Sequence, residues 1–366
     1  MENNTDQNQK YIIVTIGATG SGKTKLVDEV IRQLNSGEKC NEDENCKKHI
    51  VDDLIMKDDT FNDGLKCTIK TIKEELDEVK CDQCDINNIN NECEKELTQC
   101  KFKAIEKHNP TFENAYWNTR KKKGCRDSNS NNATKTCDTD KNVIYCNCDD
   151  KNDSQLQDSI IKGIKYIVIE GTGAKLPAEW FFNMLPKSGN NPKYNYNIIF
   201  AYSFVKYDDL ILRNKSRVIN DINNYEGAKN NPVPRLPLLS TVKGILIDSI
   251  KVLKSFYASR WKTAIFNYMD GNTAKTEYKF PEEYPIRVMI FDNNVKSNED
   301  MKLLYDNRKN EVLDNEFNKM ITDISGITEE ELNVINNGGK NRNKKSKKLR
   351  KGKKRRNTRK KTKKLI

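Results

Sequence analysis

Short runs of consecutive apolar residues alternate along the chain with stretches whose apolar residues recur at helical spacing. The first run covers 11–16, and a Gly-rich turn and a helical pattern at 26–34 follow it, which predicts a strand, a loop and a helix. Further runs of this kind lie at 50–51, 166–169, 198–205 and 286–291. Strands without polar alternation indicate a parallel sheet that helices cover on both faces. The pattern therefore predicts an α/β fold of the doubly wound class.

Composition sets one long segment apart from this pattern. Residues 67–155 are rich in Asn, Asp, Lys and Cys, and polar runs such as 127–142 cannot bury enough apolar surface to offset their loss of conformational entropy. We interpret the segment as an insertion with short helices near 68–79 and 113–120. The expected organisation is a disordered N-terminus at 1–10, a core in two parts at 11–66 and 156–338, the insertion between them, and a disordered tail at 339–366.

The net charge of +12 comes entirely from that tail. From residue 340 onwards there are 17 of the 65 Lys and Arg residues and no acidic residue, which leaves 48 basic against 53 acidic residues elsewhere. Such a tail is expected to bind nucleic acid or another polyanion without sequence preference. Lysine-rich endings of this kind resemble tails on proteins of large DNA viruses. We expect no membrane partner. The expected location is the cytoplasm, which is that of a host cell if the source is viral. The basic tail leaves the nucleus and the virus particle open as alternative locations.

All 11 cysteines lie between residues 40 and 148. Their number is odd and no apolar signal-peptide core precedes them, so we expect free thiols rather than a disulfide framework. Cys81 and Cys84 form a C-x2-C pair, and a cysteine-rich zinc site built on it is the alternative. The sequence has no second C-x2-C pair to complete such a site.

A phosphate-binding motif, G-x-x-x-x-G-K-[ST], lies between the first predicted strand and the first helix. Its residues are Gly17, Ala18, Thr19, Gly20, Ser21, Gly22, Lys23 and Thr24. Glycines let successive backbone N–H groups point at an anion, and the helix N-terminus adds partial positive charge. Lys23 is expected to contact the β- and γ-phosphates, and the Thr24 hydroxyl to bind Mg²⁺. The motif predicts nucleotide binding without choosing among GTPases, motor ATPases and kinases.

Acidic residues follow two of the predicted strands. Asp52 and Asp53 come after the strand at 50–51, and Glu170 comes after the strand at 166–169. Ligands of doubly wound sheets bind beyond the carboxyl ends of the strands, so these acids are expected beside the nucleotide. An acid at that position can accept the proton of a hydroxyl group that receives a phosphate. A helix N-cap for Asp53 and a structural acid for Glu170 are the alternatives.

Arginines follow the run at 198–205. Arg213 and Arg217 are four residues apart, which places them on one face of a predicted helix, and Arg235 follows in a Pro-Arg-Leu-Pro segment. Arginines near a transferring phosphate stabilise the charge on its oxygens. Solvated surface positions are the alternative for each of them.

These features together resemble the zeta toxin family of P-loop kinases. The resemblance rests on GATGSGKT, on the Asp after the second strand, and on YIVIEGTG after the third. IIFAYSFVKYDDLILRNKSRV is similar to the fourth strand and the arginine-bearing helix of that family. The resemblance covers 11–53 and 166–293, and it implies a kinase that uses ATP and Mg²⁺ to phosphorylate the 3′-hydroxyl of UDP-N-acetylglucosamine.

The resemblance also implies roles for individual residues. Lys23 would hold the ATP phosphates and Thr24 the metal, while Asp53 would be the base, with Asp52 as its rival. Glu170 and Thr172 would contact the acceptor sugar. Either Arg213 or Arg217, together with Arg235, would contact the γ-phosphate. Asn293 and Asn294 would lie near the adenine.

The sequence departs from the family in two places that affect the substrate. The polar stretch at 219–231 separates the two arginine positions, and the insertion separates the second strand from the third. The expected function is therefore an ATP-dependent kinase acting on a small acceptor, UDP-N-acetylglucosamine first. A polynucleotide or nucleoside kinase is the alternative within this class. Outside it, the alternative is a non-catalytic, nucleotide-dependent protein that binds nucleic acid.

Overall fold

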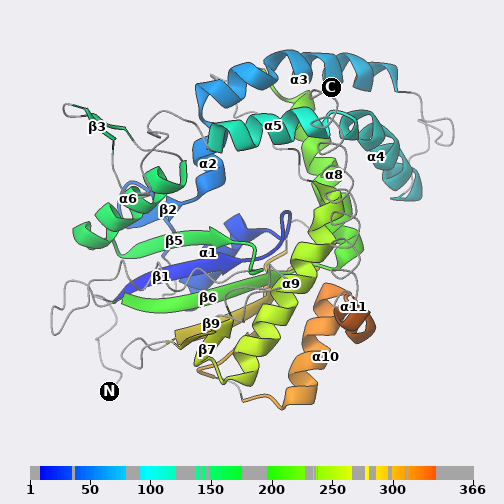
Figure 1. The fold of residues 1–366 in the computed structure, drawn as a ribbon. Helices are drawn as coiled ribbons and strands as arrows, with labels where there is room; N and C mark the ends of the chain where they lie inside the picture. The colour runs from blue at the N-terminus through cyan, green and yellow to red at the C-terminus, as the bar shows by residue number, and fades with distance from the viewer. Residues whose placement is uncertain are drawn as a thin grey trace, which may run out of the picture.

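The structure, a computed structural model, describes residues 9–34, 38–79, 91–120, 137–139, 142–144, 148–174, 196–226, 234, 236, 238–265, 277–279, 286–295, 299–309 and 311–334. At its centre lies a six-stranded sheet with the order β10-β9-β6-β1-β5-β2 (Figure 1). Neighbouring strands are parallel except β10, which is antiparallel to β9. The predicted doubly wound α/β fold is confirmed. The strands are β1 (Lys10–Ile16), β2 (Cys46–His49), β5 (Tyr166–Gly171), β6 (Tyr196–Phe204), β9 (Ile286–Asp292) and β10 (Lys302–Asp306).

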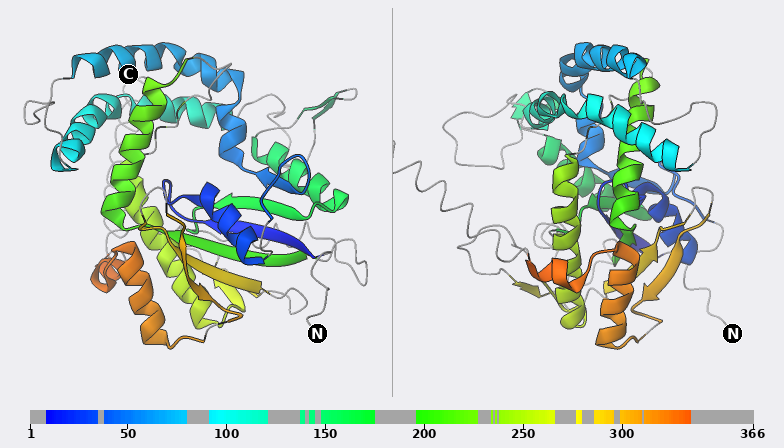
Figure 2. Two further views of the ribbon diagram at one scale, coloured as in Figure 1. Left: turned by 180° about the vertical axis from the view of Figure 1, so that it is seen from behind. Right: turned by 90° about the vertical axis from the view of Figure 1, so that its right-hand side faces the viewer.

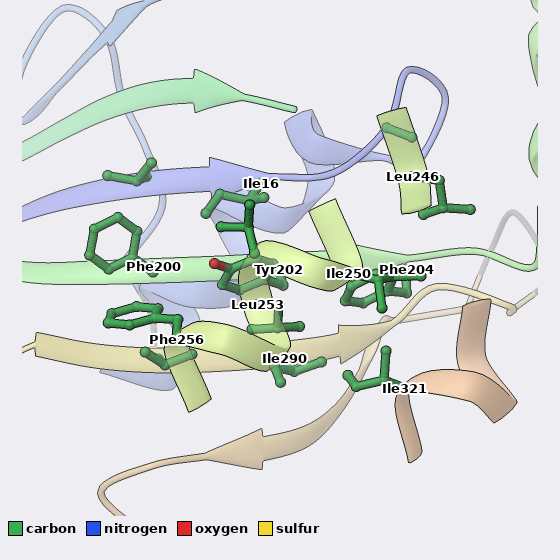
Figure 3. Packing of buried hydrophobic residues seen from close by; sticks show 14 of the residues in the cluster. Ile16, Phe200, Tyr202, Phe204, Leu246, Ile250, Leu253, Phe256, Ile290 and Ile321 are labelled. Carbon is green, nitrogen blue, oxygen red and sulfur yellow. The ribbon is translucent and has the colours of Figure 1, made fainter. Parts of the chain in front are cut away.

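Both faces of the sheet are buried, which explains the absence of polar alternation in its strands. Along β1, Ile12 and Val14 point into one core, whereas Tyr11 and Ile13 point into another on the opposite face. The first core contains side chains from α9 (Leu239–Ala258), α10 (Asp314–Ser325) and α11 (Glu329–Val334), and Figure 3 shows its packing. The second is covered by α1 (Lys23–Leu34). Most residues of the central strands are therefore apolar, whichever way they point.

A second group of helices builds a third core away from the sheet. We call α3 (Asp59–Glu78), α4 (Asn91–Glu106) and α5 (Asn109–Arg120) the helical unit. Its buried side chains pack against the C-terminal half of α8 (Tyr207–Asn223). Figures 1 and 2 show this unit beyond the sheet, with α2 (Val51–Met56) and α8 running between the two. Figure 1 also shows α6 (Cys148–Lys162) beside β5 and β2.

Two local predictions were wrong in detail. The second strand ends at His49, so the expected strand at 50–51 is instead the entry to α2, with Ile50 as its N-cap. Within the insertion, α3 begins before residue 68 and α5 before residue 113, and α4 had no recognised periodicity. Packing against α8 stabilises these helices, and such tertiary contacts are invisible to local sequence patterns. Residues 121–136, which hold most of the polar run, lie outside the described residues.

Among the residues that the structure describes, two antiparallel strand pairs lie outside the main sheet: β3 (Cys137–Thr139) with β4 (Asn142–Ile144), and β7 (Thr263–Ile265) with β8 (Glu277–Lys279). Among the helices that the structure describes, none has the length and apolar character needed to cross a membrane.

The expectation of free thiols was wrong for four cysteines. Cys40 and Cys46 form a disulfide, and Cys93 and Cys100 are disulfide-bonded as well. A turn at 41–46, in which three backbone N–H groups donate to the carbonyl of Asn41, brings the Cα atoms of Cys40 and Cys46 within 5.2 Å. A count of cysteines carries no information about such a turn. Cys67 and Cys148 are free thiols, and Cys81 and Cys84, the positions of the expected zinc pair, lie outside the described residues.

Phe102 tests whether the helical unit is part of the folded protein. Its ring is 1% exposed in the third core, and the Lys215 ammonium of α8 lies 5.6 Å from the ring centroid. Phe102→Ala is expected to lower the free energy of unfolding by about 3–5 kcal/mol, because it leaves a cavity between α4 and α8. Urea denaturation followed by circular dichroism measures this loss. The exposed neighbour Lys103→Ala is the control, and equal unfolding midpoints for the two variants would contradict the packing.

Candidate active site

The phosphate-binding motif occupies the turn between β1 and α1. Because β1 lies between β5 and β6 in the sheet, the motif is close to the carboxyl ends of both neighbours. The N–H group of Gly17 donates to the carbonyl of Gly171 at the end of β5 (3.2 Å), and that of Ser21 donates to Ala18 within the turn (3.0 Å). The predicted strand, loop and helix are therefore present, with the helix starting at Lys23.

Side chains from other elements donate hydrogen bonds to carbonyl oxygens of this turn. Asn214 Nδ2 on α8 donates to the Thr19 carbonyl (2.6 Å). Two groups, Ser203 Oγ and Asn293 Nδ2, donate to the Ser21 carbonyl at 2.6 and 2.8 Å. Carbonyl dipoles repel anions, whereas backbone N–H groups attract them. Because these bonds turn the carbonyls towards side chains, the N–H groups of the turn are suited to face a phosphate.

The backbone at Gly20 requires glycine for two reasons. Its φ angle of +88° is in the left-handed region that residues with a Cβ atom rarely adopt. A Cβ atom added there would lie 2.6 Å from Asn214 Nδ2. The motif glycine thus allows the turn to approach α8 closely enough for the bond to Thr19.

Lys23 and Glu170 form an ion pair at the base of the turn. Lys23 Nζ lies 2.9 Å from Glu170 Oε1, and it also donates to the carbonyls of Gly17 (3.0 Å) and Ala18 (3.4 Å). In the sheet, Glu170 of β5 is directly beside Thr15 of β1. The acid after the third predicted strand thus lies beside the motif lysine. Thr24, in the first turn of α1, and Thr172, in the turn after β5, both have exposed side chains.

Asp52 and Asp53 lie in the first turn of α2 and have different surroundings. Burial raises the pKa of the Asp53 carboxyl, and the charge of Glu170 raises it further, against smaller opposing effects of Lys57 and Lys48. Asp52 Oδ1 instead accepts a hydrogen bond from the Tyr116 hydroxyl (2.6 Å). The structure thus separates the two rivals: Asp53 interacts electrostatically with Glu170, and Asp52 is bound to the helical unit. Neither side chain caps α2, whose N-cap is Ile50.

The arginines of α8 differ in their contacts. Arg213 Nη2 donates to the carbonyls of Asn293 (2.9 Å) and Val295 (3.1 Å), so this arginine holds the loop after β9. Arg217 is exposed, and its Nη2 contacts Asn214 Oδ1 (3.4 Å), which connects it with the phosphate-binding turn. Arg235 lies outside the described residues.

The two asparagines after β9 support the loops around them. Asn293 donates to the phosphate-binding turn, as described above. Asn294 Oδ1 accepts from the backbone N–H of Lys206 (2.6 Å), and its Nδ2 donates to the carbonyl of Ile324 (2.9 Å). These contacts tie the loop after β9 to β6, α8 and α10.

A cleft of about 380 Å³ opens beside the phosphate-binding turn. It lies between Thr19 of the turn, helices α3 and α5 of the helical unit, and the start of α9. Its walls are mostly aromatic and aliphatic, a composition typical of small-molecule sites. The lining side chains include Phe61, Phe112, Tyr116, Trp117, Leu236 and Val242.

Sequence reasoning missed Asn214 and Ser203, and it assigned no role to Tyr116. Asn214 had a usable signal, because it stands in a helical series of buried positions with Leu210, Val218 and Ile222. A polar residue in such an apolar stripe needs a buried partner, which here is the carbonyl of Thr19. For Tyr116 no local pattern shows that α5 packs beside α2.

The effect of Glu170 on Asp53 can be measured directly. Glu170→Gln removes a negative charge, so the pKa of Asp53 is expected to fall while staying above its ordinary value of 3.8, because burial persists. Carbon-13 NMR of labelled aspartate carboxyl groups across a pH series measures this shift. Glu113→Gln, at an exposed position of α5, should leave the titration unchanged. If the pKa of Asp53 were the same in Glu170→Gln as in the wild-type protein, the two carboxyls would not interact.

No protein-family model matches this chain, and no curated protein matches it. Among solved structures, it is similar to one from the PezAT chromosomal toxin-antitoxin system of Streptococcus pneumoniae, at a TM-score of 0.36 and 10% sequence identity. The similarity covers 93% of this chain and 90% of the other. At that TM-score it is a distant likeness of fold and carries no argument about function.

Proposed function

We propose that this protein is a P-loop kinase that transfers the γ-phosphate of ATP to a hydroxyl group of a small acceptor. UDP-N-acetylglucosamine is the first candidate acceptor. The observation that carries the proposal is the joining of Lys23 to Glu170 at 2.9 Å, with Asp53 close enough for Glu170 to raise the pKa of its carboxyl. A lysine that could hold phosphates and a half-buried acid at one end of a sheet are the parts that phosphoryl transfer to a hydroxyl requires.

The residues present suit Mg²⁺-ATP. In the phosphate-binding turn the carbonyls of Thr19 and Ser21 are bonded to side chains, which favours an anion at its N–H groups. Lys23 would hold the β- and γ-phosphates, and Thr24 would bind Mg²⁺, which neutralises charge on the phosphates. Arg217, through its contact with Asn214 at the turn, is the described arginine better placed to reach the γ-phosphate, since Arg213 is bound to the loop after β9.

Asp53 is proposed as the base. The acceptor hydroxyl gives its proton to the Asp53 carboxylate, its oxygen bonds to the γ-phosphorus, and the bond between that phosphorus and the β-phosphate oxygen breaks, releasing ADP. The raised pKa of Asp53 makes it a better proton acceptor than an ordinary carboxylate. Glu170 in β5 and Thr172 just after it would contact the acceptor, and the cleft beside Thr19 would hold the rest of it.

Phosphorus-31 NMR with Mg²⁺-ATP and UDP-N-acetylglucosamine tests the reaction and the acceptor together. A new phosphomonoester signal is expected with the sugar nucleotide, and Lys23→Ala should abolish it while circular dichroism shows an unchanged fold, because the γ-phosphate loses its cation. Deleting 339–366 should leave the signal intact. Control samples contain no acceptor, a nucleoside, or an oligonucleotide with a 5′-hydroxyl. A signal with either of these acceptors alone would favour the polynucleotide or nucleoside kinase, and intact ATP in every sample would favour a nucleotide-dependent binding protein.

Asp53→Asn separates the base from groups that only bind ATP. The turnover number is expected to fall by about 100- to 10,000-fold, the usual contribution of a general base, with the KM for ATP nearly unchanged. Steady-state kinetics measures both constants. Asp52→Asn is the matched comparison and should cause a much smaller loss. If Asp52 were the base, the two variants would exchange their effects, and an equal loss of turnover and ATP affinity in Asp53→Asn would make this residue a structural one.

A further inference from the structure

A hydrogen-bonded chain connects the helical unit with the helix that carries Asp53. The Tyr116 hydroxyl of α5 donates to Asp52 Oδ1 on α2 at 2.6 Å. Arg120, one turn further along α5, donates from Nη1 to the Tyr116 oxygen at 3.2 Å. Arg120 also binds both carboxylate oxygens of Asp149 on α6, at 2.9 and 2.7 Å. Three helices that are separate in sequence are thus joined through one tyrosine hydroxyl.

The direction of each bond in this chain is determined by chemistry. A guanidinium group only donates, so the Tyr116 oxygen accepts from Arg120. An ionised carboxylate only accepts, so the single Tyr116 hydrogen points to Asp52. Asp149 in turn holds the arginine with two parallel bonds, which restricts its orientation. The hydroxyl therefore has one arrangement that satisfies all its partners.

Helix α2 needs such an external contact. It has six residues, and its N-cap Ile50 provides no side-chain hydrogen bond to the backbone of the first turn. A helix this short has little stability of its own, so tertiary contacts determine its position. Of those contacts, the one to Tyr116 reaches the first turn, one residue from Asp53.

Tyr116 also faces the cleft beside the phosphate-binding turn. Its ring lines the cleft together with Trp117 and Phe112, while its hydroxyl is bound to Asp52. Burial raises the pKa of the Tyr116 hydroxyl, so it stays protonated and able to donate. One side chain therefore contacts both the space for an acceptor and the helix of the base.

We propose that Tyr116 is a positioning residue, which holds the first turn of α2 so that Asp53 faces Glu170 and an acceptor bound in the cleft. The inference rests on the proposed function for the role of Asp53 as base, and it adds the group that fixes the location of that base. Tyr116 acts through Asp52 and takes no part in the proton transfer.

Tyr116→Phe tests this role, because it removes the hydroxyl and keeps the ring that lines the cleft. The turnover number is expected to fall by about 10- to 100-fold, as small displacements of a reacting group do, with the KM for ATP within about twofold of the wild-type value. Asp52→Asn retains an oxygen that accepts the tyrosine hydrogen, so it should keep most of the turnover that Asp52→Ala loses. Tyr225→Phe, in the core of the helical unit, is the matched control.

A second readout does not depend on activity. Asp53 is influenced by Glu170 of β5, Lys57 just after α2, Glu42 before β2 and Lys48 of β2. Once the bond to Asp52 is lost, α2 is expected to move away from this environment, and the pKa of Asp53 to fall towards its ordinary value. Carbon-13 NMR of the Asp53 carboxyl in wild-type protein and in Tyr116→Phe measures the change. Asp53→Asn identifies the signal.

The two readouts distinguish the possible outcomes. A shifted Asp53 titration in a protein that phosphorylates no acceptor would support the positioning role and contradict the proposed function. A lower thermal midpoint in Tyr116→Phe, with unchanged turnover and an unchanged Asp53 titration, would overturn the inference and leave Tyr116 a purely structural residue.

Discussion

An anion-binding turn must present its N–H groups, and its carbonyl oxygens then need partners elsewhere. In this protein the partners are side chains from three distant places: Asn214 on α8, Ser203 at the end of β6 and Asn293 after β9. These bonds connect the turn at residues 17–22 with α8, β6 and the loop after β9.

Helix α8 provides one of these partners and also connects two of the cores. Its buried positions follow a spacing of four residues, from Leu210 in the core beside the sheet to Val218 and Ile222 in the core of the helical unit. Asn214 lies between them, where the two cores meet at the phosphate-binding turn. Helix α8 thus connects the helical unit with the turn at residues 17–22. The cleft beside Thr19, with walls from both sides, is a consequence of that placement.

The charges at the site follow from strand order. β5 is the immediate neighbour of β1, so the acid after β5 meets the lysine after β1, and Lys23 pairs with Glu170. β2 lies beyond β5, and Asp53, which follows β2, is near enough to Glu170 for its charge to raise the pKa of the Asp53 carboxyl. The burial of one acid beside another is what separates Asp53 from an ordinary surface carboxylate.

The sequence alone determined the doubly wound fold, the glycine-rich turn between β1 and α1, and the presence of an acid at a strand end near that turn. These depend on apolar runs, on glycines and on the rule that parallel strands end at one edge, all of which are local or general. Only the tertiary structure decided that Ile50 begins a helix, that Cys40 and Cys46 meet, that α4 packs on α8, and that Tyr116 reaches Asp52. Each of these is a contact between segments whose own patterns are weak or polar. Such contacts depend on where other elements bring those segments, and no local spacing encodes that.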